Sequence, residues 1–139
     1  MMDEKIIAFL KKHHLLTFAT AHENIPYCAS CFYAFLDESS RFIIATDTQT
    51  TRHGKEALEN IQVAGTVALE TNIVGKIQGV QFTGVFKEAT EAEKKAYFKR
   101  FPYALAMQPS LWSIEIRYLK FTDNTLGFGK KLECFAVEK

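Results

Sequence analysis

Short runs of strand-forming residues, separated by clusters of turn-forming residues, follow one another along most of this sequence. Runs of this kind, bounded by Gly, Asn, Asp or Ser, predict β-strands in hairpin order. A strand–helix–strand alternation is absent, which argues against a parallel, doubly wound sheet. We therefore expect an α+β protein with a closed or partly closed antiparallel β-barrel at its centre. The expected strands cover residues 15–21, 25–36, 41–47, 62–69, 77–88, 112–121 and 132–137.

Short helices are expected to flank these strands. Asp3 is suited to be the N-cap of a helix over residues 3–13, whose apolar residues fall on one stripe. Thr90 and Glu93 have the spacing of a capping box, in which each side chain binds the backbone N–H of the other residue. Pro102 is expected to end the helix that this box begins.

The composition is that of a globular protein. Its 139 residues fit a single domain over residues 1–139, at roughly 100–200 residues per domain. Apolar residues make up 47% of the chain and aromatic residues 13%, which supplies a core and excludes a disordered chain. The net charge is only +1. Because no basic stripe is present, we expect no binding to DNA or RNA.

The sequence lacks the marks of a membrane or secreted protein. Its first five residues are acidic in character and lack the basic start and apolar run of a signal peptide. The longest apolar stretch, residues 25–36, contains Pro26 and is too short to cross a bilayer. Three cysteines are too few for a disulfide-rich scaffold. We expect a cytoplasmic protein with no membrane partner.

Cys28 and Cys31 have the spacing of a redox or zinc motif, but they fall within an expected strand. Residues three apart on a strand face opposite sides and lie about 10 Å from each other. A disulfide needs Cα atoms within roughly 4.4–6.8 Å, and Cys134 alone cannot complete a four-ligand zinc site. We expect two buried small residues, in a strand that is apolar and buried on both faces.

Two further motifs carry little chemistry. None of the four histidines has the spacing of a helical metal pair, so no metal site is expected. Haem ligation by one of them stays open, because a single axial His leaves no spacing signature. The GFGKK sequence at 127–131 lacks the helix that follows a phosphate loop, and a tight turn before the last strand is expected there.

The segment from Thr46 to His53 has the composition of a phosphate site. Hydroxyl and guanidinium groups gather where a strand ends and a short helix, expected to reach about Asn60, begins. Helix N-termini present unpaired N–H groups and positive potential, and Arg binds phosphate through two N–H groups. The alternative is an ordinary helix start with a Thr N-cap and a surface Arg. The residues concerned are Thr48, Thr50, Thr51, Arg52 and His53.

Together with its neighbours, this segment resembles the pyridoxamine-phosphate-oxidase-like FMN-binding split barrels. More narrowly, the chain is similar to the uncharacterised YhbP family within that superfamily. The resemblance spans nearly the whole chain, and its last block is long enough to be specific. The blocks that carry it are TRH at 51–53, VAGTV at 63–67, GVQF at 79–82, RFP at 100–102 and KFTDNTLGFGKK at 120–131.

The resemblance implies a six-stranded antiparallel split β-barrel with short flanking helices. It also implies a homodimer with two FMN molecules bound along the interface. The FMN phosphate would be held just after the third strand, by Thr50, Thr51, Arg52 and His53. The commoner pattern has Lys or Arg where His53 falls, and a neutral His contributes less to phosphate binding than a permanent cation.

The isoalloxazine ring, by the same resemblance, would lie against the second and third strands. The candidate wall there consists of Ser30, Phe32, Tyr33 and Thr46. Either Gln78 or Gln81 would hydrogen-bond the flavin, and strand alternation places the two on different faces unless a bulge intervenes. The sequence does not choose between these glutamines.

The function implied is an FMN-dependent oxidoreductase or reductase acting on a small molecule. No C-terminal clamp for pyridoxal phosphate aligns here, so oxidation of vitamin B6 is not expected. FMN suits the chain better than FAD because no adenosine-binding region is evident. Tyr33 and His53 are candidate proton donors. The alternatives are a non-catalytic flavin or haem carrier, and a barrel that binds no flavin.

Overall fold

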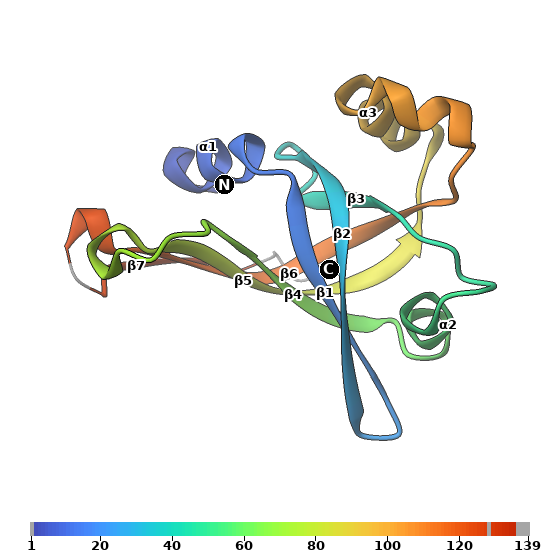
Figure 1. Cartoon of the computed structure of the whole chain (residues 1–139), viewed down its shortest axis with the longest axis horizontal. Coiled ribbons are helices and arrows are strands. Elements are labelled where there is room, and N and C mark those ends of the chain that lie inside the picture. The colour runs from blue at the N-terminus through green and yellow to red at the C-terminus, as the bar shows by residue number, and fades with distance from the viewer. Residues whose placement is uncertain (1, 128, 136–139) are drawn as a thin grey trace.

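Seven antiparallel strands form one sheet in the computed structural model, which describes residues 2–127 and 129–135. Their order is β3-β2-β1-β4-β5-β6-β7, and β3 also pairs with β6. This pairing closes six strands into a barrel and leaves β7 outside it (Figure 1). The expected six-stranded antiparallel barrel is therefore confirmed. The strands are β1 (Leu15–His22), β2 (Ile25–Leu36), β3 (Arg41–Ala45), β4 (Gln62–Ala68), β5 (Gln78–Glu88), β6 (Leu111–Asp123) and β7 (Lys131–Phe135).

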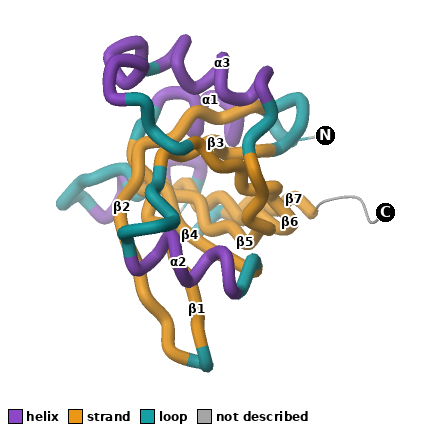
Figure 2. Tube along the Cα trace, turned by 90° about the vertical axis from the view of Figure 1, so that its right-hand side faces the viewer, coloured by secondary structure: helices purple, strands orange, loops and turns teal. Residues whose placement is uncertain are grey.

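Three α-helices flank the barrel, with α1 and α3 on one side and α2 on the other (Figures 1 and 2). The expected caps are present: the Asp3 carboxylate accepts a hydrogen bond from the N–H of Lys5, and Thr90 and Glu93 form the full capping box. Thr51 caps α2 in the same manner. The helices are α1 (Glu4–Lys12), α2 (Arg52–Glu59) and α3 (Glu91–Arg100), and the 3-10 turns are η1 (Val74–Lys76), η2 (Pro102–Met107) and η3 (Asn124–Leu126).

Aromatic rings from several strands fill the barrel. The Phe42 ring lies 5.2 Å from the ring of Tyr33 and 4.6 Å from that of Phe82, measured between centroids. Helix α1 adds Ile6 and Leu10, both almost fully buried, to the same cluster. Removing these large apolar surfaces from water is the main force that holds the barrel closed.

A β-bulge changes the buried face of β6. Thr83 pairs with Tyr118 whereas Gly84 pairs with Ile116, so Arg117 has no cross-strand partner on β5. An unbroken strand alternation that buries Ile116 would bury Tyr118 as well. Beyond the bulge, however, Leu119 and Phe121 are the buried residues, and Tyr118 is only half-buried. A Cβ on Gly84 would lie 2.7 Å from a β6 carbonyl oxygen, so the close approach of the strands here requires glycine.

The expectation that β2 is buried on both faces is wrong for residues 25–32, whose outer face is exposed. Cys28 is exposed and Phe32 is 57% exposed, whereas Cys31 is buried and Tyr33 has no exposed surface. The β1–β2 hairpin projects beyond the barrel (Figures 1 and 2). On its outer face the Phe32 ring lies 5.6 Å from the ring of Phe101, which follows α3. The two cysteines are free and face opposite sides, as predicted, but only Cys31 is a buried small residue.

The segment after β6 forms the expected tight turn. Gly127 and Gly129 have positive φ angles of 136° and 75°, and the Lys130 N–H donates to the Gly127 carbonyl over 2.9 Å. The strand expected over residues 132–137 is observed as β7, and residues 136 and 137 lie outside the described residues. Within the described ranges, no helix is long and apolar enough to span a membrane.

Candidate functional site

The turn before α2 is fixed by its own hydrogen bonds. One carboxylate oxygen of Asp47 accepts from the N–H groups of Gln49 and Thr50, at 2.8 and 3.2 Å. These bonds hold the pKa of Asp47 below its usual range. The Thr51 hydroxyl donates to the Asp47 carbonyl and accepts from the Gly54 N–H. Thr51 is therefore used as a helix cap, and the Thr50 side chain, hydrogen-bonded to the Asp47 carboxylate, also lowers the pKa of Asp47.

Arg52 follows directly, and two neighbours hold its guanidinium. Its Nε donates to one Glu56 carboxylate oxygen at 2.9 Å, and the other oxygen accepts from the Thr20 hydroxyl at 2.8 Å. The guanidinium carbon lies 4.2 Å from the centre of the Tyr27 ring, a cation–π geometry. Within the described chain, its two terminal nitrogens have no protein partner. The side chain is thus fixed along one edge while its outer nitrogens stay available to an anion.

His53 is turned inward. Its Nε2 lies 2.8 Å from the Thr46 hydroxyl, and its ring meets the Phe18 ring edge-on. Burial lowers the pKa of His53, with the nearby Glu56 carboxylate opposing this effect, so the imidazole is neutral at pH 7. Thr46 is itself buried. The two side chains satisfy each other, and His53 adds no positive charge to the start of α2.

Ser30, Phe32 and Gln81 share a second location, the outer face of the barrel. Cross-strand pairing places Ser30 beside Thr17, Thr17 beside Thr66, and Thr66 beside Gln81. Phe32, two residues beyond Ser30, therefore points to the same face. This row of hydroxyl and amide groups runs across four strands.

The two glutamines are separated, because the only bulge recorded between β5 and β6 lies beyond both of them. Gln81 is exposed on the outer face, whereas Gln78 lies on the inner face with Val80 and borders a cavity beside α1. Of the two residues, only Gln81 shares a surface with Ser30.

Tyr33 does not belong to either location. It is fully buried, and its hydroxyl donates to the Leu10 carbonyl at 2.6 Å. Burial raises the pKa of this phenol. In this structure Tyr33 neither lines a surface nor has a free proton to give, because the inward-facing side of β2 carries it into the core. Its assignment as ligand wall and as proton donor is thereby corrected.

Residues that the sequence had not singled out complete the surroundings of Arg52. Glu56 lies four residues after Arg52, the spacing of a helical ion pair, so the sequence held a signal for it. Tyr27 and Thr20 carried no such signal, since they reach α2 only because the β1–β2 hairpin passes beside this helix (Figure 2). No cluster of three or more metal-ligating side chains occurs in residues 2–127 and 129–135.

The closed barrel with its short helices places this protein in the fold class of the pyridoxamine-phosphate-oxidase-like split barrels. A FAD-binding protein from Mesorhizobium loti matches it with a TM-score of 0.70 at 13% identity, over 87% of this chain and 94% of that chain. A heme binding protein from Mycobacterium smegmatis matches with a TM-score of 0.68 at 14% identity, over 88% of this chain and 52% of that chain. These likenesses concern the fold.

The sequence identifies the family within this class. The family model described as pyridoxamine 5'-phosphate oxidase matches residues 2–121. The UPF0306 protein YhbP of Salmonella schwarzengrund is 41% identical over 128 residues, which covers 89% of this chain and 86% of the relative. The chain belongs to the pyridoxamine 5'-phosphate oxidase family and to its UPF0306 group, as the sequence blocks predicted.

Proposed function

We propose that this protein is a cytoplasmic, FMN-binding homodimer that acts as an oxidoreductase on a small molecule. The observation that carries the proposal is Arg52, whose guanidinium is held by Glu56 and Tyr27 while its outer nitrogens face no protein group of the described chain. Such an arrangement at the N-terminus of a helix suits a phosphate. Thr50 lies beside it, with its side chain directed to the Asp47 carboxylate. Thr51 and His53 support the turn and add little direct binding.

The flavin ring would lie on the outer face of β2 and its neighbours. Ser30 and Gln81 can hydrogen-bond a flavin from this face, and Phe32 offers an apolar contact. Tyr27, under Arg52, and Ser30 are three residues apart on β2 and therefore face opposite sides of this strand. A flavin that reaches both would pass over the edge of β2, which pairs with β3 only from Tyr33 onward. Gln78 and Tyr33 are not part of the proposed flavin site.

A second copy of the chain would cover this face. Leu15 and Phe32 are 50% and 57% exposed there, next to each other in the β1–β2 ladder. Exposed apolar side chains grouped in this manner mark an interaction surface. The proposed dimer therefore buries the outer face and encloses the flavin between two barrels.

Hydride or electron transfer would be supplied by the flavin, while this chain binds, orients and shields it. Because the flavin carries out this chemistry, the protein does not need an acid–base pair near the ring. Ser30 and Gln81 would hold the ring in place, and Arg52 would anchor the phosphate. The neutral His53 maintains the helix start through Thr46.

A non-catalytic carrier of flavin or haem is the second candidate. It is favoured by the solved structures of similar fold, one a FAD-binding protein and the other a heme binding protein. An absorbance spectrum of the protein after incubation with FMN or with haem, followed by gel filtration, tests both proposals. Retained flavin together with oxidation of NADH or NADPH in the presence of an acceptor supports the oxidoreductase.

Retained flavin without turnover would support the carrier. A Soret band after haem incubation, with no retained FMN, would replace the flavin proposal with a haem-binding function. Retention of neither ligand would contradict both proposals.

A further inference from the structure

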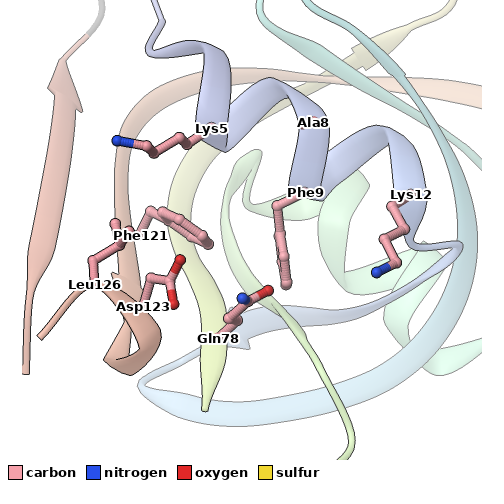
Figure 3. A pocket seen from close by; sticks show the side chains of 8 residues that line it. All are labelled: Lys5, Ala8, Phe9, Lys12, Gln78, Phe121, Asp123 and Leu126. Carbon is pink, nitrogen blue, oxygen red and sulfur yellow. The ribbon is translucent and has the colours of Figure 1, made fainter. Parts of the chain in front are cut away.

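A cavity of about 320 Å³ opens between α1 and the adjoining ends of β5 and β6 (Figure 3). It lies on the α1 side of the barrel, whereas α2 lies on the opposite side (Figure 1). Its size is at the lower end of the range for small-molecule sites. None of its lining residues belongs to the proposed flavin site, so a ligand bound in this cavity does not depend on the proposed function.

Helix α1 forms the roof of this cavity with one face. Lys5, Ala8, Phe9 and Lys12 follow the spacing of residues that share a helix face. The small Ala8 side chain leaves open space between the two lysines. A larger residue at this position would occupy part of the cavity.

The inner wall is aromatic. The rings of Phe9 and Phe121 lie 5.1 Å apart between centroids, inclined at 49°. Leu126 of η3 extends this wall and is 41% exposed. Phe9 and Phe121 are only 5% and 2% exposed, so they present only their edges, and a ligand covers mainly the exposed surface of Leu126 and Ala8.

Two polar side chains stand at the floor. Gln78 and Asp123 are direct partners in the β5–β6 ladder. One Asp123 oxygen accepts from the N–H and the hydroxyl of Thr125, at 2.9 and 2.6 Å, so this carboxylate is held by η3. The Gln78 amide points up into the cavity (Figure 3), and it has no hydrogen-bond partner among the residues that the structure describes.

The charges divide the cavity into two ends. In Figure 3 Asp123 lies on the same side as Lys5, and Lys12 reaches toward Gln78 from the other side. Neither Lys5 nor Lys12 forms an ion pair within residues 2–127 and 129–135, although the adjacent Lys11 pairs with Asp37 at 2.8 Å. The end formed by Lys12 and Gln78 is therefore positive, and Asp123 does not offset it there.

We propose that this cavity binds a small aromatic carboxylate. The carboxylate group binds the Lys12 ammonium and the Gln78 amide N–H, while the ring lies against the Ala8 methyl group and the exposed edges of Phe9 and Phe121. A neutral ligand of the same shape gains the apolar contact but not the charge interaction. A cationic ligand is disfavoured by the two lysines.

The test uses benzoate as the probe and benzamide as its neutral counterpart, titrated into the full chain and followed by amide shifts in ¹H–¹⁵N correlation spectra. Shifts centred on residues 5–12, 78 and 121–126 are expected with benzoate at millimolar concentration. Benzamide should bind several-fold more weakly. Lys12→Gln is expected to weaken benzoate binding about three- to fivefold, as for a solvent-exposed charge pair.

Two further variants test whether benzoate binds in this cavity. Lys11→Gln is the matched control for charge and should leave the benzoate affinity unchanged. Ala8→Leu fills the cavity from an exposed helix position and should weaken both probes more than tenfold. Absent shifts, equal affinities for the two probes, or unchanged binding in Lys12→Gln and Ala8→Leu would overturn the proposal. Displacement of benzoate by FMN would overturn the cavity as a site separate from the flavin.

Discussion

Arg52 has more restraints than an arginine in the first turn of a helix usually has. Glu56 fixes its Nε, and Tyr27 covers one face of the guanidinium, although the side chain is 53% exposed. Thr20 in turn holds the second oxygen of Glu56, and both bonds lower the pKa of this carboxyl. A side chain already held in one arrangement loses less conformational entropy when it binds a ligand. This restraint is the reason to assign the phosphate to Arg52.

Replacing Arg52 with Ala should weaken FMN binding about ten- to a hundredfold. A charge-assisted hydrogen bond contributes roughly 1.5–3 kcal/mol, which corresponds to that range in affinity. Lys55→Ala is the matched control, since Lys55 is an exposed cation on the same helix. Quenching of flavin fluorescence in an equilibrium titration measures both variants. Equal affinity of the Arg52→Ala variant and the unchanged protein would remove Arg52 from the phosphate site.

The lowered pKa of His53 predicts that the folded protein loses stability on mild acidification. Its pKa is lowered in the folded state, so the unfolded chain binds a proton more readily as the pH falls. The contribution of the neutral His53 is therefore fully present above its ordinary value of about 6.5 and decreases below it. His53→Gln keeps a hydrogen-bonding group for Thr46 but does not titrate.

Urea unfolding between pH 7.5 and about 5, above the range in which carboxylates titrate, measures this effect. The unchanged protein should lose more unfolding free energy over the interval than the His53→Gln variant. Parallel pH profiles of the two proteins would show that His53 is not responsible.

Local sequence signals predicted the residues at the start of α2 but not the orientation of Tyr33. The Thr51 cap and the charged Arg52 follow from composition and spacing within one turn. Tyr33 was misassigned because its strand is apolar on both faces in sequence, and burial depends on what packs against each face. In the structure the backbone carbonyl of Leu10 in α1 accepts a hydrogen bond from the Tyr33 hydroxyl. The two residues are 23 positions apart in the chain.

At the scale of elements, Glu93 ties α3 to the barrel beside the apolar cluster around Tyr97. One carboxylate oxygen of Glu93 accepts from the Thr90 N–H at 2.9 Å, and the other lies 3.5 Å from Nε of Arg41 on β3. Its side chain is only 9% exposed. The helix cap and the anchoring ion pair thus share one residue.

Glu93→Ala should therefore destabilise the protein by about 1–3 kcal/mol, because a cap and a largely buried charge partner are lost together. Glu91→Ala is the control from the same helical turn, since Glu91 is exposed and pairs only with Lys94. It should cost at most about 0.5 kcal/mol. Urea denaturation compares the two. Equal losses in both variants would show that the contacts of Glu93 add nothing beyond helix propensity.

Every strand and α-helix that the described residues contain was predicted from the sequence to within a few residues, because turns and caps are local signals. The 3-10 turns η1, η2 and η3 were not predicted. Gly79 and Gly84 in the sequence indicated bulges or bends in β5, and the register confirms one between Thr83 and Gly84, but the sequence did not indicate that Arg117 is the residue left unpaired. The exposure of Cys28 was not predicted either. Both features depend on the register between strands and on what packs against each face of a strand. Neither can be read from one segment of sequence.

At the scale of the whole molecule, the outer face of the barrel is the main unexplained surface. Its row of Ser30, Thr17, Thr66 and Gln81 carries polar groups, and Phe32 stands exposed at its side. A monomer leaves this face in water. The proposed dimer covers this face and brings flavin-binding groups from two chains together.

Sedimentation equilibrium monitored at the flavin absorbance tests this account most directly. The protein loaded with FMN should sediment as a yellow species of twice the 15.8 kDa chain mass, with one flavin per chain. Thr66→Arg, which places a charge on the outer face, should release both the partner and the flavin, whereas Ala92→Arg on the exposed side of α3 should change neither. Flavin absorbance that remains at the mass of the free ligand, or a flavin-loaded monomer, would contradict the account.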